Sequence, residues 1–179
     1  EWYRRPADRD RGAMAFSVSK TLTSLLAARA VAAGAVASLD EPIAARIPEL
    51  ARRDERLGAI TLAELLDLRS GLGFSEDAHF PWVDQDAPAV YYASDLARTV
   101  VRRPRLVEPR GTFRYNDYAP NLVGLALERA TGTRAAAATQ ALWHELGAEA
   151  AAAWLVDEHG FAWHESGRAS CRERAYHPV

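Results

Sequence analysis

The apolar residues of this chain fall into short segments separated by polar residues and glycines, and most segments have helical spacing. Residues 17–33 are apolar on nearly every side of a helix, and Gly34 stands where such a helix would end. We therefore expect a buried, central helix here. In the next segment, Asp40 can cap a second helix over about residues 40–50, with Pro42 in its first turn.

A third helix has a clearer start signal. Thr61 and Glu64 have the spacing of a capping box, and Gly71 follows the expected last turn. Residues 73–93 combine aromatic, acidic and proline residues without helical period, which predicts a long loop that either lines a binding site or is a plain surface excursion.

The second half of the chain is predicted to hold three helices and a hairpin. Ser94 can cap the first of these helices and Pro104 can end it, while Gly132 can end the second. The predicted elements are a helix from 94 to 103, an extended run over 112–115, a helix that ends at 132, a helix over 134–146 and a hairpin over 152–166 with its turn at Asp157–Gly160.

The composition is that of a globular protein and narrows the functions open to it. The chain has 179 residues, is 49% hydrophobic and has a formal net charge of −2, which gives no electrostatic basis for binding nucleic acid or an anionic membrane. Its longest apolar stretch, 22–39, is interrupted by Arg29 and favours a buried helix over a membrane span. Cys171 is the only cysteine and the five histidines lack zinc-ligand spacing, so we expect no metal and no cofactor.

Both ends of the chain differ from its middle. Residues 1–12 form a charged run without an initiator Met. From Gly167 onward, the composition is no longer dominated by Ala, Leu and Val as it is in the preceding residues. We expect a fragment in which residues 1–166 are a partial domain and residues 167–179 are an atypical tail of non-native sequence. The compartment and the oligomeric state are left open.

Lys20 is the only lysine, and it follows Ser17 by three residues; the other 21 of the 22 Lys and Arg residues are arginine. A lysine amine can lose its proton and act as a base, whereas a guanidinium cannot. Positions i and i+3 of a helix are neighbours, and a serine hydroxyl needs an adjacent base to become a nucleophile. Ser17 and Lys20 are therefore a candidate nucleophile and general base; a chance pair of surface residues is the alternative.

Several sequence segments around and after Ser17 and Lys20 also have a recognisable order and spacing. "FSVSKTLTSLLAARAVAAG" is followed by "LDEP" at 39–42, by "LLDLRSGL" at 65–72 and by "GTFRYNDYAPNLVGLALERATG". Over about residues 14–165 the chain resembles the serine beta-lactamase and penicillin-binding protein superfamily, most closely the branch of class C beta-lactamases, esterases and 6-aminohexanoate-dimer hydrolase-like amidases. The resemblance implies an α+β fold, of which this chain holds mainly the helical region and lacks most of the antiparallel sheet. It also implies an acyl-enzyme formed on Ser17 with Lys20 as base.

In that branch a Tyr-x-Asn motif precedes a helix with an "LLG"-like triplet, and here it corresponds to Tyr115, Asn116 and Asp117 with "LVG" at 122–124. The resemblance implies that Tyr115 passes a proton to the leaving group and that Asn116 and Asp117 bind substrate. Asp117 departs from the usual Asn, and an acceptor-only anion there could rewire the contact to Lys20 or weaken substrate binding. The alternatives are a core-packing Tyr115 and helix caps at Asn116 or Asp117.

The branch's third motif, Lys-x-Gly or His-x-Gly on a late strand, is missing from this sequence. Two interpretations remain. In the first, the chain is a serine hydrolase of a small-molecule amide or ester, with an amidase or esterase preferred to a carboxypeptidase or beta-lactamase. In the second, it is a catalytically inactive binding domain of the same fold, which Asp117 and the missing motif favour.

Overall fold

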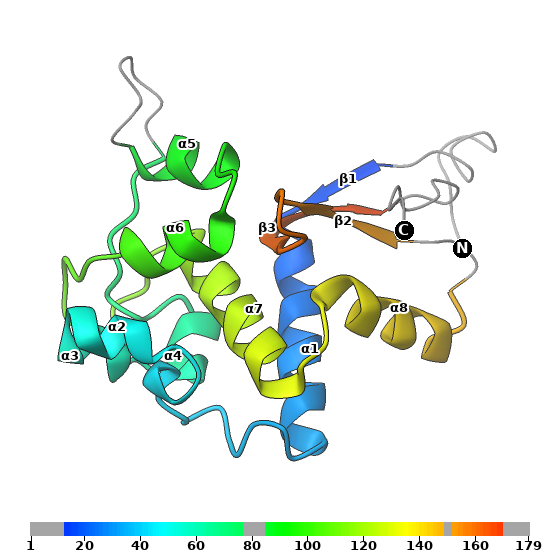
Figure 1. The fold of residues 1–179 in the computed structure, drawn as a ribbon, viewed down its shortest axis with the longest axis horizontal. Helices are drawn as coiled ribbons and strands as arrows, with labels where there is room; N and C mark the ends of the chain where they lie inside the picture. The colour runs from blue at the N-terminus through cyan, green and yellow to red at the C-terminus, as the bar shows by residue number, and fades with distance from the viewer. Residues whose placement is uncertain (1–12, 77–84, 149–151, 170–179) are drawn as a thin grey trace.

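The computed structural model describes residues 13–76, 85–148 and 152–169. Helices α1 and α7 lie side by side at the centre, and α1 begins beneath a small sheet (Figure 1). The short helices α2 to α6 lie on the side of α7 away from α1, and α8 lies below the sheet (Figure 1). The elements are β1 (Ala13–Phe16), α1 (Ser19–Ala32), the 3-10 helix η2 (Ile43–Ala45), α2 (Pro48–Arg53), α3 (Glu55–Gly58), α4 (Leu62–Leu66), α5 (Asp86–Tyr91), α6 (Leu96–Arg102), α7 (Tyr118–Thr131), α8 (Ala135–Glu145), β2 (Ala152–Val156) and β3 (Ala162–Ala169).

The most deeply buried helix is α7, not the predicted central helix at 17–33. Residues 118–127 are all buried, and Gly132 ends the helix with a left-handed φ of +68°, as predicted. Helix α1 forms where expected but buries only one side, through Ser19, Thr23, Leu26, Ala27 and Ala30. The alanine-rich sequence does not reveal which side of this helix is buried, because alanine occurs on both buried and exposed faces.

The capping box at Thr61 and Glu64 is confirmed, since each side chain accepts a hydrogen bond from the other residue's backbone N–H. The helix ends at Leu66, earlier than Gly71 suggested. Leu68 has a left-handed φ of +56°, and its carbonyl accepts a hydrogen bond from Arg114 N at 2.8 Å. A long-range backbone contact therefore ends the helix before the glycine does.

The single helix predicted over 40–50 is wrong. Pro42 is extended, η2 is a short turn, and a separate helix α2 begins at Pro48. Pro48 has no N–H to continue a helix and disfavours helical geometry at the residue before it. Ile47 accordingly has φ −127° and ψ 69°, outside the helical region.

Part of the predicted loop over 73–93 is also helical. Helix α5 covers 86–91, while residues 77–84 lie outside the described residues. The helix expected at 94–103 is present as α6, but Asp95, not Ser94, caps it by accepting from Arg98 N at 2.8 Å. Residues 112–115 form neither helix nor strand. Helix α8 confirms the helix predicted over 134–146.

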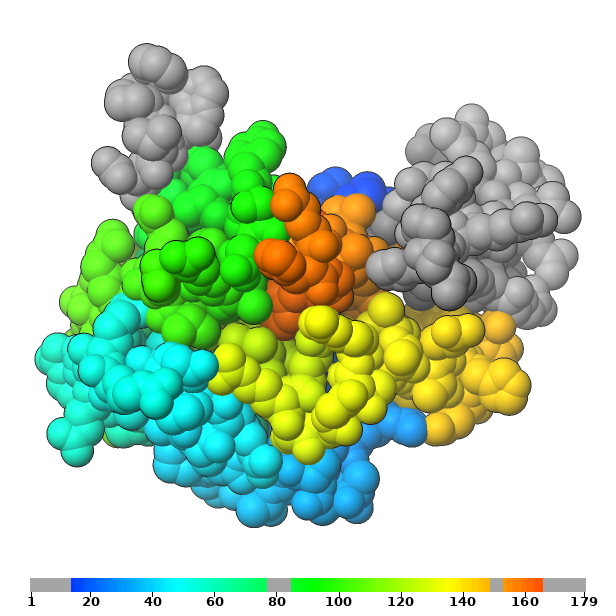
Figure 2. All heavy atoms as spheres, viewed as in Figure 1, coloured from blue at the N-terminus to red at the C-terminus, as the bar shows by residue number. Residues whose placement is uncertain are grey.

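The hairpin predicted over 152–166 is confirmed, because β2 and β3 pair antiparallel around a turn at Asp157–Gly160. Strand β3 also pairs antiparallel with β1, so the sheet order is β1-β3-β2. In the space-filling view the hairpin turn lies between α5–α6 and α7–α8 (Figure 2). Asp157 Oδ2 accepts from Leu96 N at 2.8 Å and Trp163 Nε1 donates to Val90 O at 3.1 Å, so the hairpin fixes α5 and α6.

Strand β3 ends at Ala169, so residues 167–169 belong to the sheet and residues 170–179 lie outside the described part. The atypical tail therefore stays a prediction. Within the described ranges no helix has the length and apolarity that crossing a bilayer requires.

Candidate active site

Ser17 lies in the turn that joins β1 to α1. Val18 N donates to Ala15 O at 3.1 Å, and Lys20 N donates to Ser17 O at 3.1 Å, so the turn is closed by two backbone hydrogen bonds. Lys20 lies in the first turn of α1, and its Nζ donates to Ser17 Oγ at 3.1 Å. The i, i+3 spacing thus produces the contact that it predicts.

Tyr115 reaches the same hydroxyl from a distant part of the chain. It lies in the segment before α7, and its Oη is 2.5 Å from Ser17 Oγ. Lys20 Nζ lies 4.8 Å from the centroid of the Tyr115 ring, within cation–π range. The parallel arrangement of α1 and α7, which begin at the same end, brings the three side chains together (Figure 1).

Asp117 is the counter-ion of Lys20. Its Oδ1 is 2.9 Å from Lys20 Nζ, and its side chain is only 3% exposed. Its Oδ2 accepts a hydrogen bond from Tyr91 Oη at 2.7 Å. Asp117 therefore contacts Lys20 as an ion pair, and its role in substrate binding stays a prediction. Burial and the Asp117 carboxylate raise the pKa of Tyr91 above its usual range, so Tyr91 is a neutral donor.

Asn116 makes the hydrogen bonds of a helix cap. Its Oδ1 accepts from Ala119 N at 2.8 Å in the first turn of α7, and its Nδ2 donates to Arg114 O at 3.0 Å. The side chain is buried. Both ends of the amide are thus bonded to the backbone of its own segment, and its role in substrate binding stays a prediction.

Strand β3 forms a wall beside Lys20, and it adds a residue that the sequence analysis missed. The carbonyl of Glu165 accepts a hydrogen bond from Lys20 Nζ at 3.5 Å, and Glu165 Oε2 accepts from Asn121 Nδ2 at 2.5 Å. Burial raises the pKa of Glu165 to about 8, so its carboxyl is protonated at neutral pH. The only available signal was a glutamate that follows the apolar residues of a predicted strand.

Tyr91 was also missed, because it falls in the segment predicted to be a loop. Its part in the site depends on helix α5, which holds Tyr91 at the carboxylate of Asp117. No spacing rule pairs residues that are 26 positions apart, as Tyr91 and Asp117 are.

His164 links strand β3 to the two central helices, α1 and α7, by hydrogen bonds. Its Nδ1 is 2.9 Å from Thr23 Oγ1 on α1, and its backbone N donates to Asn121 Oδ1 on α7 at 2.9 Å. Burial lowers its pKa to about 3, so the imidazole is neutral. The ring packs over Gly124, where a Cβ atom would lie 2.1 Å from two ring atoms.

The two buried groups predict how stability depends on pH. Glu165 has a folded pKa raised from 4.5 to about 8, so its contribution is complete below pH 4.5 and is lost as pH rises through 8. His164 has a folded pKa lowered from 6.5 to about 3, so its contribution is complete above pH 6.5 and is lost as pH falls through 3. Between pH 4.5 and 6.5 the two slopes oppose each other.

The free energy of unfolding should therefore fall above pH 6.5, and Glu165→Gln should remove most of this fall. Glutamine keeps the acceptor for Asn121 and carries no proton to lose. We expect the parent to lose up to about 1.4 kcal/mol per pH unit between about pH 6.5 and 8. Urea unfolding across this range measures it, with the exposed Glu158 changed to Gln as the control. Equal slopes for the parent and Glu165→Gln would refute the assignment.

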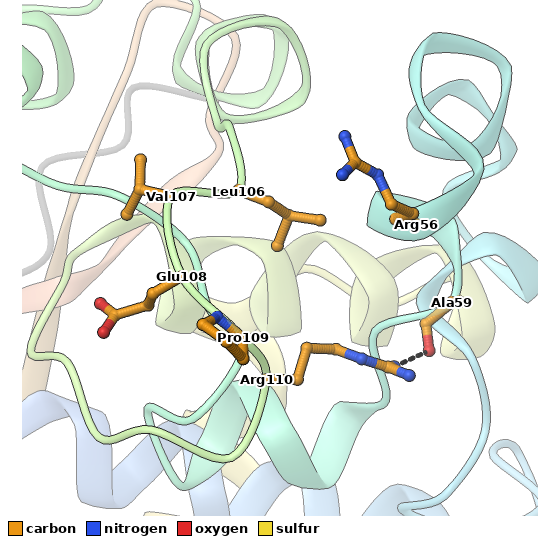
Figure 3. A pocket seen from close by; sticks show the side chains of 7 residues that line it. All are labelled: Arg56, Ala59, Leu106, Val107, Glu108, Pro109 and Arg110. Carbon is orange, nitrogen blue, oxygen red and sulfur yellow. Dashed lines mark hydrogen bonds between the residues drawn. The ribbon is translucent and has the colours of Figure 1, made fainter.

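A separate pocket of about 490 Å³ lies away from the candidate site residues, between α3 and the segment before α7 (Figure 3). Its charged side chains are paired: Arg110 bonds Ala59 O and Glu64, and Arg56 bonds Asp54. Since none of the predicted site residues lines it, it is not the candidate site. It is lined by Arg56, Ala59, Leu106, Val107, Glu108, Pro109 and Arg110.

No group of three or more His, Cys, Asp or Glu side chains in the described part of the chain is arranged to hold a metal ion. The chemistry available here is that of a hydroxyl, an amine, two phenols and two carboxyl groups. These are groups for proton transfer and for nucleophilic attack.

Comparison with known proteins gives one family. The beta-lactamase family model matches residues 2–171. A candidate 6-aminohexanoate-dimer hydrolase from Bacillus anthracis superposes with a TM-score of 0.77 at 19% identity, over 95% of this chain and 47% of that chain. A D-stereospecific amidohydrolase from Streptomyces sp. has a TM-score of 0.67 at 19% identity, over 90% and 57% of the two chains. A class C beta lactamase from Rhodobacter sphaeroides has a TM-score of 0.64 at 24% identity, over 92% and 49%.

The chain spans about half the length of these solved structures. A search of curated proteins found no match. The predicted resemblance is confirmed, and so is the predicted fold class: an α+β chain that contains mainly the helical region of the fold beside a small antiparallel sheet.

Proposed function

The chain belongs to the beta-lactamase family, and from this premise we propose that it is a serine hydrolase that cleaves an amide or ester bond. It has the fold of hydrolases of that family. The observation that carries the proposal is the contact of one serine hydroxyl with both an amine and a phenol, at 3.1 and 2.5 Å. An amine and a phenol on the same hydroxyl can serve the two proton transfers that acyl transfer requires.

In the first half-reaction, Ser17 Oγ attacks the carbonyl carbon while its proton passes to Lys20 Nζ. The tetrahedral intermediate carries an oxyanion, which backbone N–H groups at the start of α1 can stabilise. Tyr115 then donates its proton to the leaving nitrogen or oxygen, the bond to the leaving group breaks, and Tyr115 recovers a proton from Lys20. The acyl group stays on Ser17.

In the second half-reaction, water attacks the acyl carbon and gives its proton to the same base. Ser17 Oγ leaves with a proton returned through Tyr115, so the product acid is released and the enzyme is regenerated. Asp117 has the role of an orienting anion: it holds Lys20 and stabilises the ammonium that forms each time the amine accepts a proton.

The substrate is proposed to be a small amide or ester. The similar structures from Bacillus anthracis and Streptomyces sp. are named as a 6-aminohexanoate-dimer hydrolase and an amidohydrolase, and their TM-scores of 0.77 and 0.67 exceed the 0.64 of the class C beta lactamase. This order supports an amidase or esterase over the carboxypeptidase and beta-lactamase activities. The inactive binding domain is the second candidate, because the Lys20–Asp117 ion pair competes with the neutral amine that a base requires.

The test is reaction with a fluorophosphonate, followed by intact-mass measurement. We expect one phosphonyl adduct on the parent chain and none on Ser17→Ala. Ser24→Ala, which removes an exposed serine of the same helix, is the matched control and should be labelled as the parent is. Absence of the adduct from the parent would contradict the hydrolase and favour the binding domain.

A further inference from the structure

Phe16, the last residue of β1, has a backbone conformation that is unusual for a bulky side chain. Its φ is +44°, in the left-handed region. The pairing of β1 with β3 is irregular between Met14 and Phe16, and bulges of this kind redirect side chains beside active sites. Ser19 Oγ donates to Phe16 O at 2.7 Å and holds this conformation.

The strained backbone leaves the Phe16 ring largely in solvent. Phe16 is 65% exposed, and Val18, on the other side of Ser17, is 70% exposed. A strained conformation that exposes an apolar ring has a cost in stability, so its position next to a nucleophile points to a role in function.

Further apolar surface belongs to the segments that carry the other site residues. Phe113, two residues before Tyr115, is 61% exposed, and Tyr91 and Tyr92 of the α5 region are also exposed. Exposed apolar residues normally occur singly, and here they recur beside several of the site residues along the chain, which supports a binding surface.

The charges at this site compensate one another. Lys20 is paired with Asp117, and Arg114, beside Tyr115, is paired with Glu108. Burial keeps Glu165 protonated at neutral pH, so it adds no charge there. A substrate carboxylate at Ser17 would have to compete with Asp117 for Lys20, whereas an uncharged group displaces no ion pair.

We propose that the substrate carries an uncharged apolar acyl group and that Phe16 is the residue that selects it, with Val18 completing the contact. The acyl group stays bonded to Ser17 Oγ through the intermediate, and Phe16 and Val18 are the exposed apolar residues that flank Ser17 in the chain. The proposal rests on the hydrolase function and names the substrate class for the same site.

The test is the hydrolysis of p-nitrophenyl esters that share a leaving group and differ in the acyl chain. The parent is expected to favour octanoate over acetate by about tenfold in kcat/KM, and Phe16→Ala should remove most of that preference while changing acetate hydrolysis little. The hemisuccinate, whose acyl group is that of butyrate with a carboxylate in place of the terminal methyl, should be a poorer substrate than butyrate. Leu146→Ala, at a site 63% exposed on the distant end of α8, is the matched control.

The Phe16→Gly variant distinguishes a role of Phe16 in acyl-group preference from a role in the stability of the fold. Glycine adopts a positive φ without strain, so this variant should unfold at the same temperature as the parent or higher, while still losing the octanoate preference. A parent that hydrolyses acetate and octanoate equally, prefers hemisuccinate, or keeps its preference in both Phe16 variants would overturn the proposal. No hydrolysis of any ester together with no phosphonyl adduct would instead be a failure of the hydrolase function itself.

Discussion

Lys20→Arg is expected to lower kcat/KM for ester hydrolysis by about 10³-fold or more, with little change in the fold. An arginine can keep the ion pair with Asp117, because its guanidinium is a forked donor suited to a carboxylate. It cannot give up its proton at neutral pH, so it cannot accept the proton of Ser17. The substitution therefore keeps the positive charge of the site and removes only the base.

Steady-state kinetics measures this effect, and circular dichroism establishes that the variant is folded. Arg29→Lys, the reciprocal exchange at an exposed position of the same helix, should leave kcat/KM unchanged. A Lys20→Arg variant with a rate within about tenfold of the parent would show that charge is sufficient at this position. The base would then have to be Tyr115, the other group in contact with Ser17 Oγ.

The parts of the fold that could be predicted are those set by local chemistry. The capping box at Thr61 and the glycine stop at Gly132 each need only residues of one helix, and both are present. Two of the failures arise where distant segments decide. Leu68 leaves the helix to bond Arg114, and helix α5 packs beside α6 and the hairpin without a periodic pattern of its own.

The residues of the candidate site also fall into two groups: those that local sequence could pair and those that only the fold brings together. Ser17 and Lys20 could be paired by helical spacing alone, because three residues separate them. Tyr115 is 98 residues from Ser17, and only the family resemblance connected the two. Tyr91 and Glu165 have no local signature: each belongs to the site because a hairpin or a short helix carries it to Asp117 and Lys20.

Gly124 shows how closely the site and the fold depend on each other, and Gly124→Ala is expected to destabilise the chain by about 3 kcal/mol or more. In an unobstructed helix the same change would stabilise by about 1 kcal/mol, because alanine has the higher helix propensity. Here the new Cβ would lie 2.1 Å from Cδ2 and Nε2 of His164. The ring cannot move aside easily, since Thr23 and Asn121 hold its side chain and backbone. Urea unfolding measures the loss.

The same variant should also lose reactivity toward the fluorophosphonate, because a displaced His164 moves Glu165 and its contact with Lys20. His164→Ala in the Gly124→Ala background removes the clash, so the double variant should be more stable than the sum of the two single changes predicts. A Gly124→Ala chain as stable as the parent, or additive effects in the double variant, would show that the ring has room to move. If instead the two changes are coupled, the glycine in "LVG" is required because it lets strand β3 approach helix α7 closely enough to form the wall beside Lys20.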